Sequence, residues 1–129
     1  MGKNLIQQAR GKGGPRYRAP SFNYKGAALY AKATQDLLVG KVRDIVHCAG
    51  HSGPLVEVEY NDGQLALLQA AEEMHVGMQV AMGADAEVKT GNVLPLRNIP
   101  EGTLIFNIES VPGDGGKFVR TSGGCAKIV

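Results

Sequence analysis

Apolar and polar residues alternate in two stretches near the middle of the chain, and this period of two is typical of half-buried β-strands. The alternation runs through residues 40–46 and again through residues 55–60. The tripeptide Asn-Asp-Gly follows at residues 61–63, and its Asp-Gly pair tolerates the positive φ of a tight hairpin turn. We therefore expect a three-stranded meander over residues 37–70, with a loop at residues 48–54.

The third strand of this meander has a competing interpretation. Residues 65–74, LALLQAAEEM, are rich in residue types that favour a helix. The hairpin turn before them favours a strand over residues 65–69, because a tight turn brings the chain back antiparallel to the preceding strand. We predict the strand, and we expect Glu72 and Glu73 to form a solvated turn rather than a catalytic pair.

A second set of short strands is predicted after residue 78. The strand-like stretches are residues 79–82, 85–89, 93–94, 103–108 and 126–129. Turns rich in glycine, proline and asparagine separate several of them, and this spacing is typical of small β-barrels.

The glycine-rich segment at residues 112–116, PGDGG, is followed by two cations, Lys117 and Arg120. Glycine lets the backbone approach a phosphate closely, so the loop is a candidate anion site. It lacks the GxxxxGK[ST] order and the following helix of a nucleotide-binding P-loop, and we reject that motif.

Charge is distributed unevenly along the chain, although the net charge is only +2. Residues 1–43 hold nine lysines and arginines against one acid, a balance of +8, whereas the remainder holds five against eleven, a balance of −6. A basic arm on a mildly acidic body indicates a polyanionic partner that is reached mainly through the N-terminus.

Aromatic residues are interleaved with the cations of residues 1–36, and little periodicity appears there before residue 27. One interpretation is a disordered solubilising tail. The other is an arm that is disordered alone and extended on RNA, with cations on phosphates and rings on bases or sugars. The interleaving favours the RNA-binding arm.

The loop at residues 47–51, HCAGH, offers up to three zinc ligands, but no fourth ligand is close in sequence and no CxxC pair exists. No spacing identifies the base and orienting acid of a Cys-His hydrolase. We therefore expect no metal, no cofactor, no small-molecule substrate and no enzymatic activity.

Two cysteines, no signal-peptide core and no long apolar run predict a reduced, cytoplasmic protein without a membrane partner.

Three ordered motifs carry a resemblance to a known family. They are GNVLPLRNIPEGT at residues 91–103, NIE at residues 107–109, and PGDGGK at residues 112–117 followed by Arg120. With them, the chain resembles the N-terminal and central part of the universal large-subunit ribosomal protein L-two family, archaeal type. RGKG at residues 10–13 is similar to the archaeal and eukaryotic branch.

The resemblance implies an all-β protein with a basic arm (residues 1–36), an OB-like barrel (residues 37–78) and an incomplete SH3-like barrel (residues 79–129). It implies a ribosome-bound, non-catalytic protein whose partners are large-subunit ribosomal RNA and neighbouring ribosomal proteins. Subunit association, tRNA placement and assembly of the peptidyl-transferase region are the implied roles. The alternative is a non-ribosomal nucleic-acid-binding β-barrel of the translation-factor type. Because the family chain is longer, we expect a fragment, a truncated form or half of a split protein.

The predicted RNA contacts lie in the arm and at four positions of the body. They are Lys3, Arg10, Lys12, Arg16, Tyr17, Arg18, Lys25, Lys32, His51, Arg97, Lys117 and Arg120. By resemblance, Arg120 matches an RNA-contacting arginine of the family, whereas His51 stands where a second one is usual. A neutral imidazole lacks the charge and bidentate fork of arginine. We expect His51 and Arg120 to occupy exposed positions on one RNA-facing side.

Overall fold

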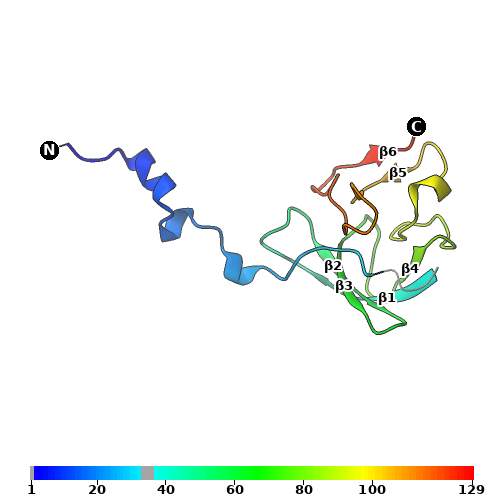
Figure 1. Cartoon of the computed structure of the whole chain (residues 1–129). Coiled ribbons are helices and arrows are strands. Elements are labelled where there is room, and N and C mark those ends of the chain that lie inside the picture. Colours follow the sequence, from blue (N-terminus) through cyan, green and yellow to red (C-terminus); the bar gives the residue numbers. More distant parts are fainter. Residues whose placement is uncertain (1, 33–36) are drawn as a thin grey trace.

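The computed structural model describes residues 2–32 and 37–129. A body built from strands carries an N-terminal arm that extends away from it (Figure 1). The arm contains three short 3-10 helices, η1 (Ile6–Lys12), η2 (Pro15–Tyr17) and η3 (Ser21–Asn23), none of which buries a residue. The arm therefore gains little from packing against the body before residue 24.

Four antiparallel strands form the main sheet in the order β3-β2-β1-β4. They are β1 (Leu37–Val46), β2 (Leu55–Tyr60), β3 (Leu65–Gln69) and β4 (Gln79–Gly83). The first three confirm the predicted meander, including a strand rather than a helix at β3. Glu72 and Glu73 are exposed in a turn, as expected.

β4 hydrogen-bonds to β1 on the side opposite β2, with Leu38 facing Met82 across the ladder. The predicted boundary after residue 78 thus falls between two strands of one sheet, and the division into two modules stays a prediction. The all-β class is confirmed. Within the two described ranges, however, the sheet is open and does not close into a barrel.

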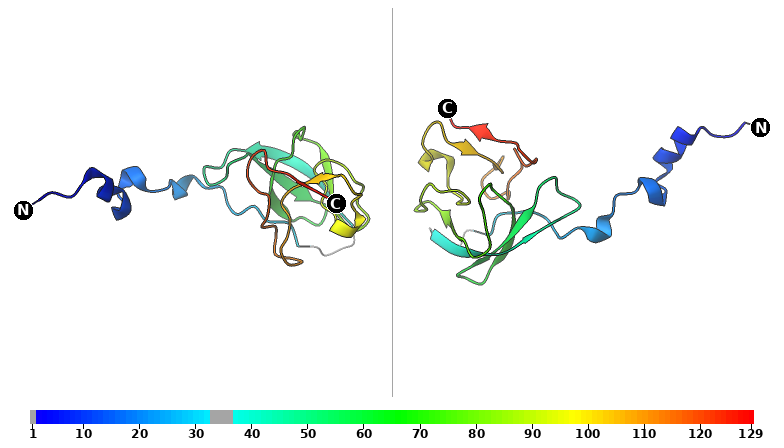
Figure 2. Two further views of the ribbon diagram at one scale, coloured as in Figure 1. Left: turned by 90° about the horizontal axis from the view of Figure 1, so that it is seen from above. Right: turned by 180° about the vertical axis from the view of Figure 1, so that it is seen from behind.

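Alternation along the strands places the main core on one face of this sheet. The core consists of Leu38, Val42, Val56, Val58, Tyr60, Ala66, Leu68, Val80 and Met82. Two views show the C-terminal segment, with its short strands, lying over one side of the sheet (Figures 1 and 2). Burial of this apolar surface is the main force that holds the body together.

The second set of strands is shorter than predicted. β5 (Leu104–Ile105) pairs antiparallel with β6 (Ala126–Lys127), and isolated bridges join Met82 to Val93 and Ile108 to Phe118. One more 3-10 helix, η4 (Leu96–Asn98), lies between Val93 and β5 in sequence.

The predicted strand at residues 85–89 is wrong. The Asn92 side chain, instead of a neighbouring strand, bonds the backbone there. Asn92 accepts a hydrogen bond from the Ala81 N–H at 2.8 Å and donates one to the Glu87 carbonyl at 2.9 Å. This amide closes residues 84–91 into a loop. In the described part of the chain, no helix is long and apolar enough to cross a bilayer.

Candidate nucleic-acid interface

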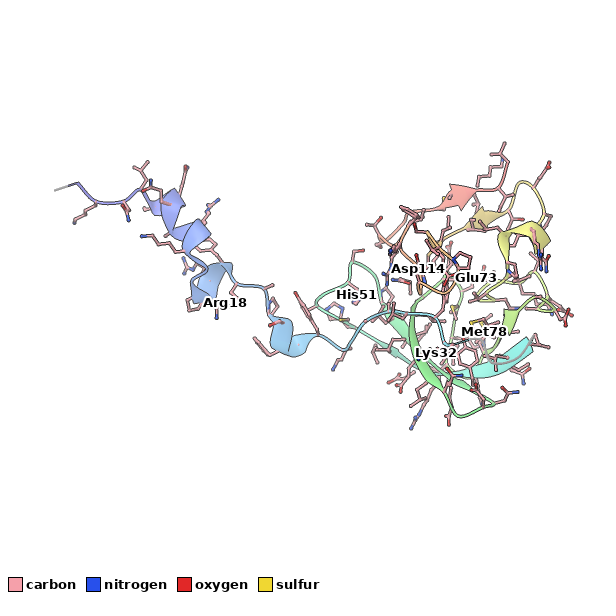
Figure 3. The ribbon with its side chains drawn as sticks, viewed as in Figure 1. Arg18, Lys32, His51, Glu73, Met78 and Asp114 are labelled. Carbon is pink, nitrogen blue, oxygen red and sulfur yellow. The ribbon has the colours of Figure 1, made fainter. Side chains whose placement is uncertain are left out.

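The arm presents its cations to solvent. The five before residue 24 are all exposed, and no ion pair involves them in the described structure: Lys3, Arg10, Lys12, Arg16 and Arg18. Figure 3 shows Arg18 projecting from the arm, well away from the body. Tyr17 is also exposed, and the Arg10 guanidinium lies 5.6 Å from its ring centre in a cation–π contact. The arm thus combines free positive charge with accessible aromatic surface.

Residues 24–32, here called the strap, join this arm to the body. The strap makes these backbone hydrogen bonds: Lys25 N–H to Cys48 Sγ (3.3 Å), Leu29 N–H to the Leu67 carbonyl (3.0 Å), and Lys32 N–H and carbonyl to the Gln64 amide (3.1 Å each). Ala28 is fully buried beside Cys48 and Leu55. The strap therefore protects the edge strand β3 and sets the point where the arm leaves the body. The ammonium groups of Lys25 and Lys32 remain on the surface.

His51 lies at the side of the body from which the arm leaves (Figure 3). It is half-buried, and its Nδ1 is 3.2 Å from the Sγ of buried Cys48. Hydrogen bonds from the Lys25 backbone and the His51 ring lower the pKa of the Cys48 thiol to about 7, although burial opposes them. His51 is thus engaged within the body. Among residues 2–32 and 37–129, no group of three or more His, Cys, Asp or Glu could hold a metal ion.

The glycine-rich loop does not offer its backbone to a phosphate. Asp114 accepts hydrogen bonds from the N–H groups of Ser110, Val111 and Gly116 at 3.0–3.1 Å. Glu109 accepts those of Gly113 and Gly115 at 3.0–3.1 Å. Because the loop's own carboxylates occupy these donors, the predicted backbone anion site is wrong. Lys117 is exposed, with its ammonium 3.7 Å from Asp114.

The occupied loop predicts acid sensitivity. Burial acts to raise the pKa of Asp114, but the N–H groups of Gly116, Val111 and Ser110, together with Lys117, outweigh it and hold the pKa below its usual value. The carboxylate therefore stabilises the fold above the unfolded-state pKa, and this contribution disappears as pH falls through the folded-state pKa. We expect Asp114→Asn to lower the urea midpoint at pH 7, with the difference from the parent vanishing in acid.

The matched control for this substitution is Asp85→Asn, because Asp85 is an exposed turn residue. We expect the Asp85 variant to unfold like the parent at every pH. Equal midpoints for the Asp114 variant and the parent at pH 7 would show that the carboxylate does not hold the loop.

Arg120 is half-buried, with most of its donors directed into the protein. Nη1 donates to the Gly116 carbonyl at 3.1 Å, and Nη2 donates to the Ala28 carbonyl. With the Gln69 amide turned so that its oxygen faces the guanidinium, Nη2 and Nε each donate to it at 2.9 Å. The expectation that His51 and Arg120 both occupy exposed positions is wrong. A direct RNA contact by either residue stays a prediction.

The predicted contacts do not form one cluster. Arg97 is exposed on η4, and η4 lies on the side of the body away from the arm (Figure 1). Two exposed cations on β1, Lys41 and Arg43, were not among the predicted RNA contacts. The alternation of β1 could have identified Lys41 as outward-facing, whereas Arg43 sits at a break in register between Val42 and Asp44.

Comparisons with known proteins give the same family as the sequence motifs. Residues 89–129 match the family described as Ribosomal Proteins L2, C-terminal domain. The chain is 46% identical to the large ribosomal subunit protein uL2 of Methanococcus vannielii, an alignment that covers 100% of the chain and 56% of that protein. It is also 46% identical to uL2 of Methanococcus aeolicus, over 97% of the chain and 53% of that protein. The chain spans about half the length of the curated relatives it matches.

The fold and the exposed arm define a small all-β protein with a basic N-terminal extension. Within that class, the chain is similar over its whole length to archaeal ribosomal protein uL2, of which it spans about half. The resemblance carried by the motifs between residues 91 and 120 is confirmed.

Proposed function

We propose that this chain is a structural, non-catalytic constituent of the large ribosomal subunit that binds large-subunit ribosomal RNA through its arm. The observation that carries the proposal is the set of five exposed arm cations, which have no acidic partner in the described structure. A polyanion outside the body is the partner that suits them. The uL2 names of the relatives support the ribosomal assignment.

RNA binding by the arm combines two kinds of contact. Lysines and arginines neutralise phosphates and release condensed counterions, which makes the affinity depend on salt. Tyr17 is 44% exposed and Phe22 86% exposed, so their rings are free to stack on unpaired bases. Because none of the three 3-10 helices buries a residue, the arm adopts its final extended path only on the RNA.

The finer assignment follows from the family. In this proposal the chain is ribosome-bound in the cytoplasm, contacts neighbouring ribosomal proteins, and needs no cofactor. It contributes to subunit association, tRNA placement and assembly of the peptidyl-transferase region. Lys25, Lys32, His51, Arg97, Lys117 and Arg120 are candidate contacts on the body, and the two modules of the body are OB-like and SH3-like.

A salt titration of RNA binding tests the proposal. The full chain is bound to large-subunit ribosomal RNA fragments and, at matched salt, to small-subunit fragments of equal length. We expect at least about tenfold tighter binding to the large-subunit RNA, a threshold well below the roughly 10³–10⁷-fold that usually separates specific from non-specific DNA binding. The logarithm of the affinity should fall linearly with the logarithm of the salt concentration, by roughly 0.7–0.9 per phosphate contact. Equal affinity for both RNAs would contradict the ribosomal assignment and favour a general nucleic-acid-binding module.

A further inference from the structure

Arg120 connects three segments that are far apart in sequence. Its guanidinium bonds the strap at the Ala28 carbonyl, the glycine-rich loop at the Gly116 carbonyl, and the end of β3 at the Gln69 side chain. In this arrangement four of the five guanidinium N–H donors point at protein acceptors. A bidentate phosphate contact would require at least one of these internal bonds to break.

Arg120 and one of its acceptors, Gln69, belong to a polar cluster, here called the polar hub (Tyr30, Gln69, Asn107 and Arg120). Asn107 is 2% exposed and Gln69 is 8% exposed. Tyr30, in the strap, donates its hydroxyl to the Asn107 carbonyl and its backbone N–H to the Gly115 carbonyl at 3.3 Å. Burial, with the nearby Glu109 charge, raises the pKa of the Tyr30 hydroxyl to about 12. The hydroxyl thus stays protonated and remains a donor at neutral pH.

The bonded members of a buried polar cluster fix the arrangement of the segments that supply their partners. Among the described residues Asn107 Oδ1 is buried without a hydrogen-bond partner, so the strap is held by the bonds of Arg120 and Tyr30. Here the strap is bonded at two residues. The Ala28 carbonyl accepts from Arg120 of the hub, and Tyr30 bonds Asn107 of the hub and Gly115 of the loop. Lysine cannot replace Arg120 in this role, because a single ammonium lacks the planar fork that spans several acceptors.

We propose that Arg120 is a positioning residue for RNA binding. By holding the Ala28 carbonyl, its guanidinium fixes the strap on the body and thereby the direction in which the basic arm leaves. Its effect on RNA affinity then passes through the arm, and this role replaces the direct RNA contact considered for Arg120 above. This inference rests on the proposed RNA-binding function, but its first test does not.

The first test uses free protein. Amide exchange is measured at Leu29 and Tyr30, whose N–H groups bond the body, and at Val42 in β1 as a reporter of global unfolding. In Arg120→Lys and Arg120→Gln we expect exchange about tenfold faster or more at Leu29 and Tyr30, since local opening requires less free energy than global unfolding. Exchange at Val42 should change less. Lys117→Gln, a charge change in the same loop outside the hub, should leave all three amides as in the parent.

The second test is a double-mutant cycle in RNA binding. The same Arg120 variants are made in the parent and in a chain whose five arm cations (Lys3, Arg10, Lys12, Arg16 and Arg18) are replaced by glutamine. If Arg120 positions the arm, Arg120→Lys and Arg120→Gln weaken binding equally, by roughly tenfold, and have almost no effect in the neutral-arm chain.

A phosphate contact gives a different pattern. Arg120→Lys would then retain most of the affinity, while Arg120→Gln would remove about one unit of salt slope in both backgrounds. Equal effects of Arg120→Gln in the parent and in the neutral-arm chain would overturn the positioning role. Unchanged exchange at Leu29 and Tyr30 would overturn it as well. If the parent itself shows no preference for large-subunit RNA, the proposed function fails, whereas the exchange result still decides whether Arg120 anchors the strap.

Discussion

Neutralising the five arm cations with glutamine lowers the affinity for large-subunit RNA by about two to four decades near 0.1 M salt. The residues replaced are Lys3, Arg10, Lys12, Arg16 and Arg18, all exposed on the arm. If each contacts one phosphate, the salt slope becomes shallower by roughly four units, because a contact contributes about 0.7–0.9. Filter binding over a range of salt concentrations measures both quantities in one series.

The controls separate the arm from general electrostatics. Lys127→Gln removes one exposed charge from β6, and we expect it to change the slope by at most about one unit. The neutral-arm chain should unfold at the same temperature as the parent, because none of the five side chains is buried. A slope within one unit of the parent would place RNA recognition on the body instead of the arm.

The strands of the main sheet could be predicted because the signals that specify them lie in short, continuous stretches of sequence. Alternation and one Asp-Gly turn define β1, β2 and β3, and the pairing of consecutive strands then follows. β5 and β6 are only two residues each. Their segments lie among turns, so the strand-like composition of residues 103–108 overestimated the length of the strand.

The site could be predicted only where exposure decides it. A basic arm without periodicity is recognisable from its sequence, and the structure leaves its cations on the surface. The polar hub could not be predicted, because Tyr30, Gln69, Asn107 and Arg120 meet through the folded chain and share no spacing. The glycine-rich loop was misinterpreted for a different reason. Asp114 sits inside the motif, and a short acidic side chain in a turn tends to bond its own backbone.

The same loop contains the position where a single methyl group should have the largest effect on stability. Gly116 is buried with φ at +98°, a conformation that residues with a Cβ rarely adopt. A Cβ placed there would collide with the side-chain amide of Asn107, which is buried in the polar hub. Because Asn107 is only 2% exposed, moving its amide away would disturb the packed groups around it.

We therefore expect Gly116→Ala to destabilise the protein by about 3 kcal/mol or more, the sum of backbone strain and overpacking. Gly113→Ala is the matched control in the same loop, since Gly113 has φ at +84° but no atom within 4 Å of its would-be Cβ. Backbone strain alone should lower its free energy of unfolding, by about 1–2 kcal/mol. Urea unfolding at constant m-value measures both free energies. The difference between the two variants isolates the collision with Asn107, and equal losses would mean that Asn107 yields and that the hub is not rigid.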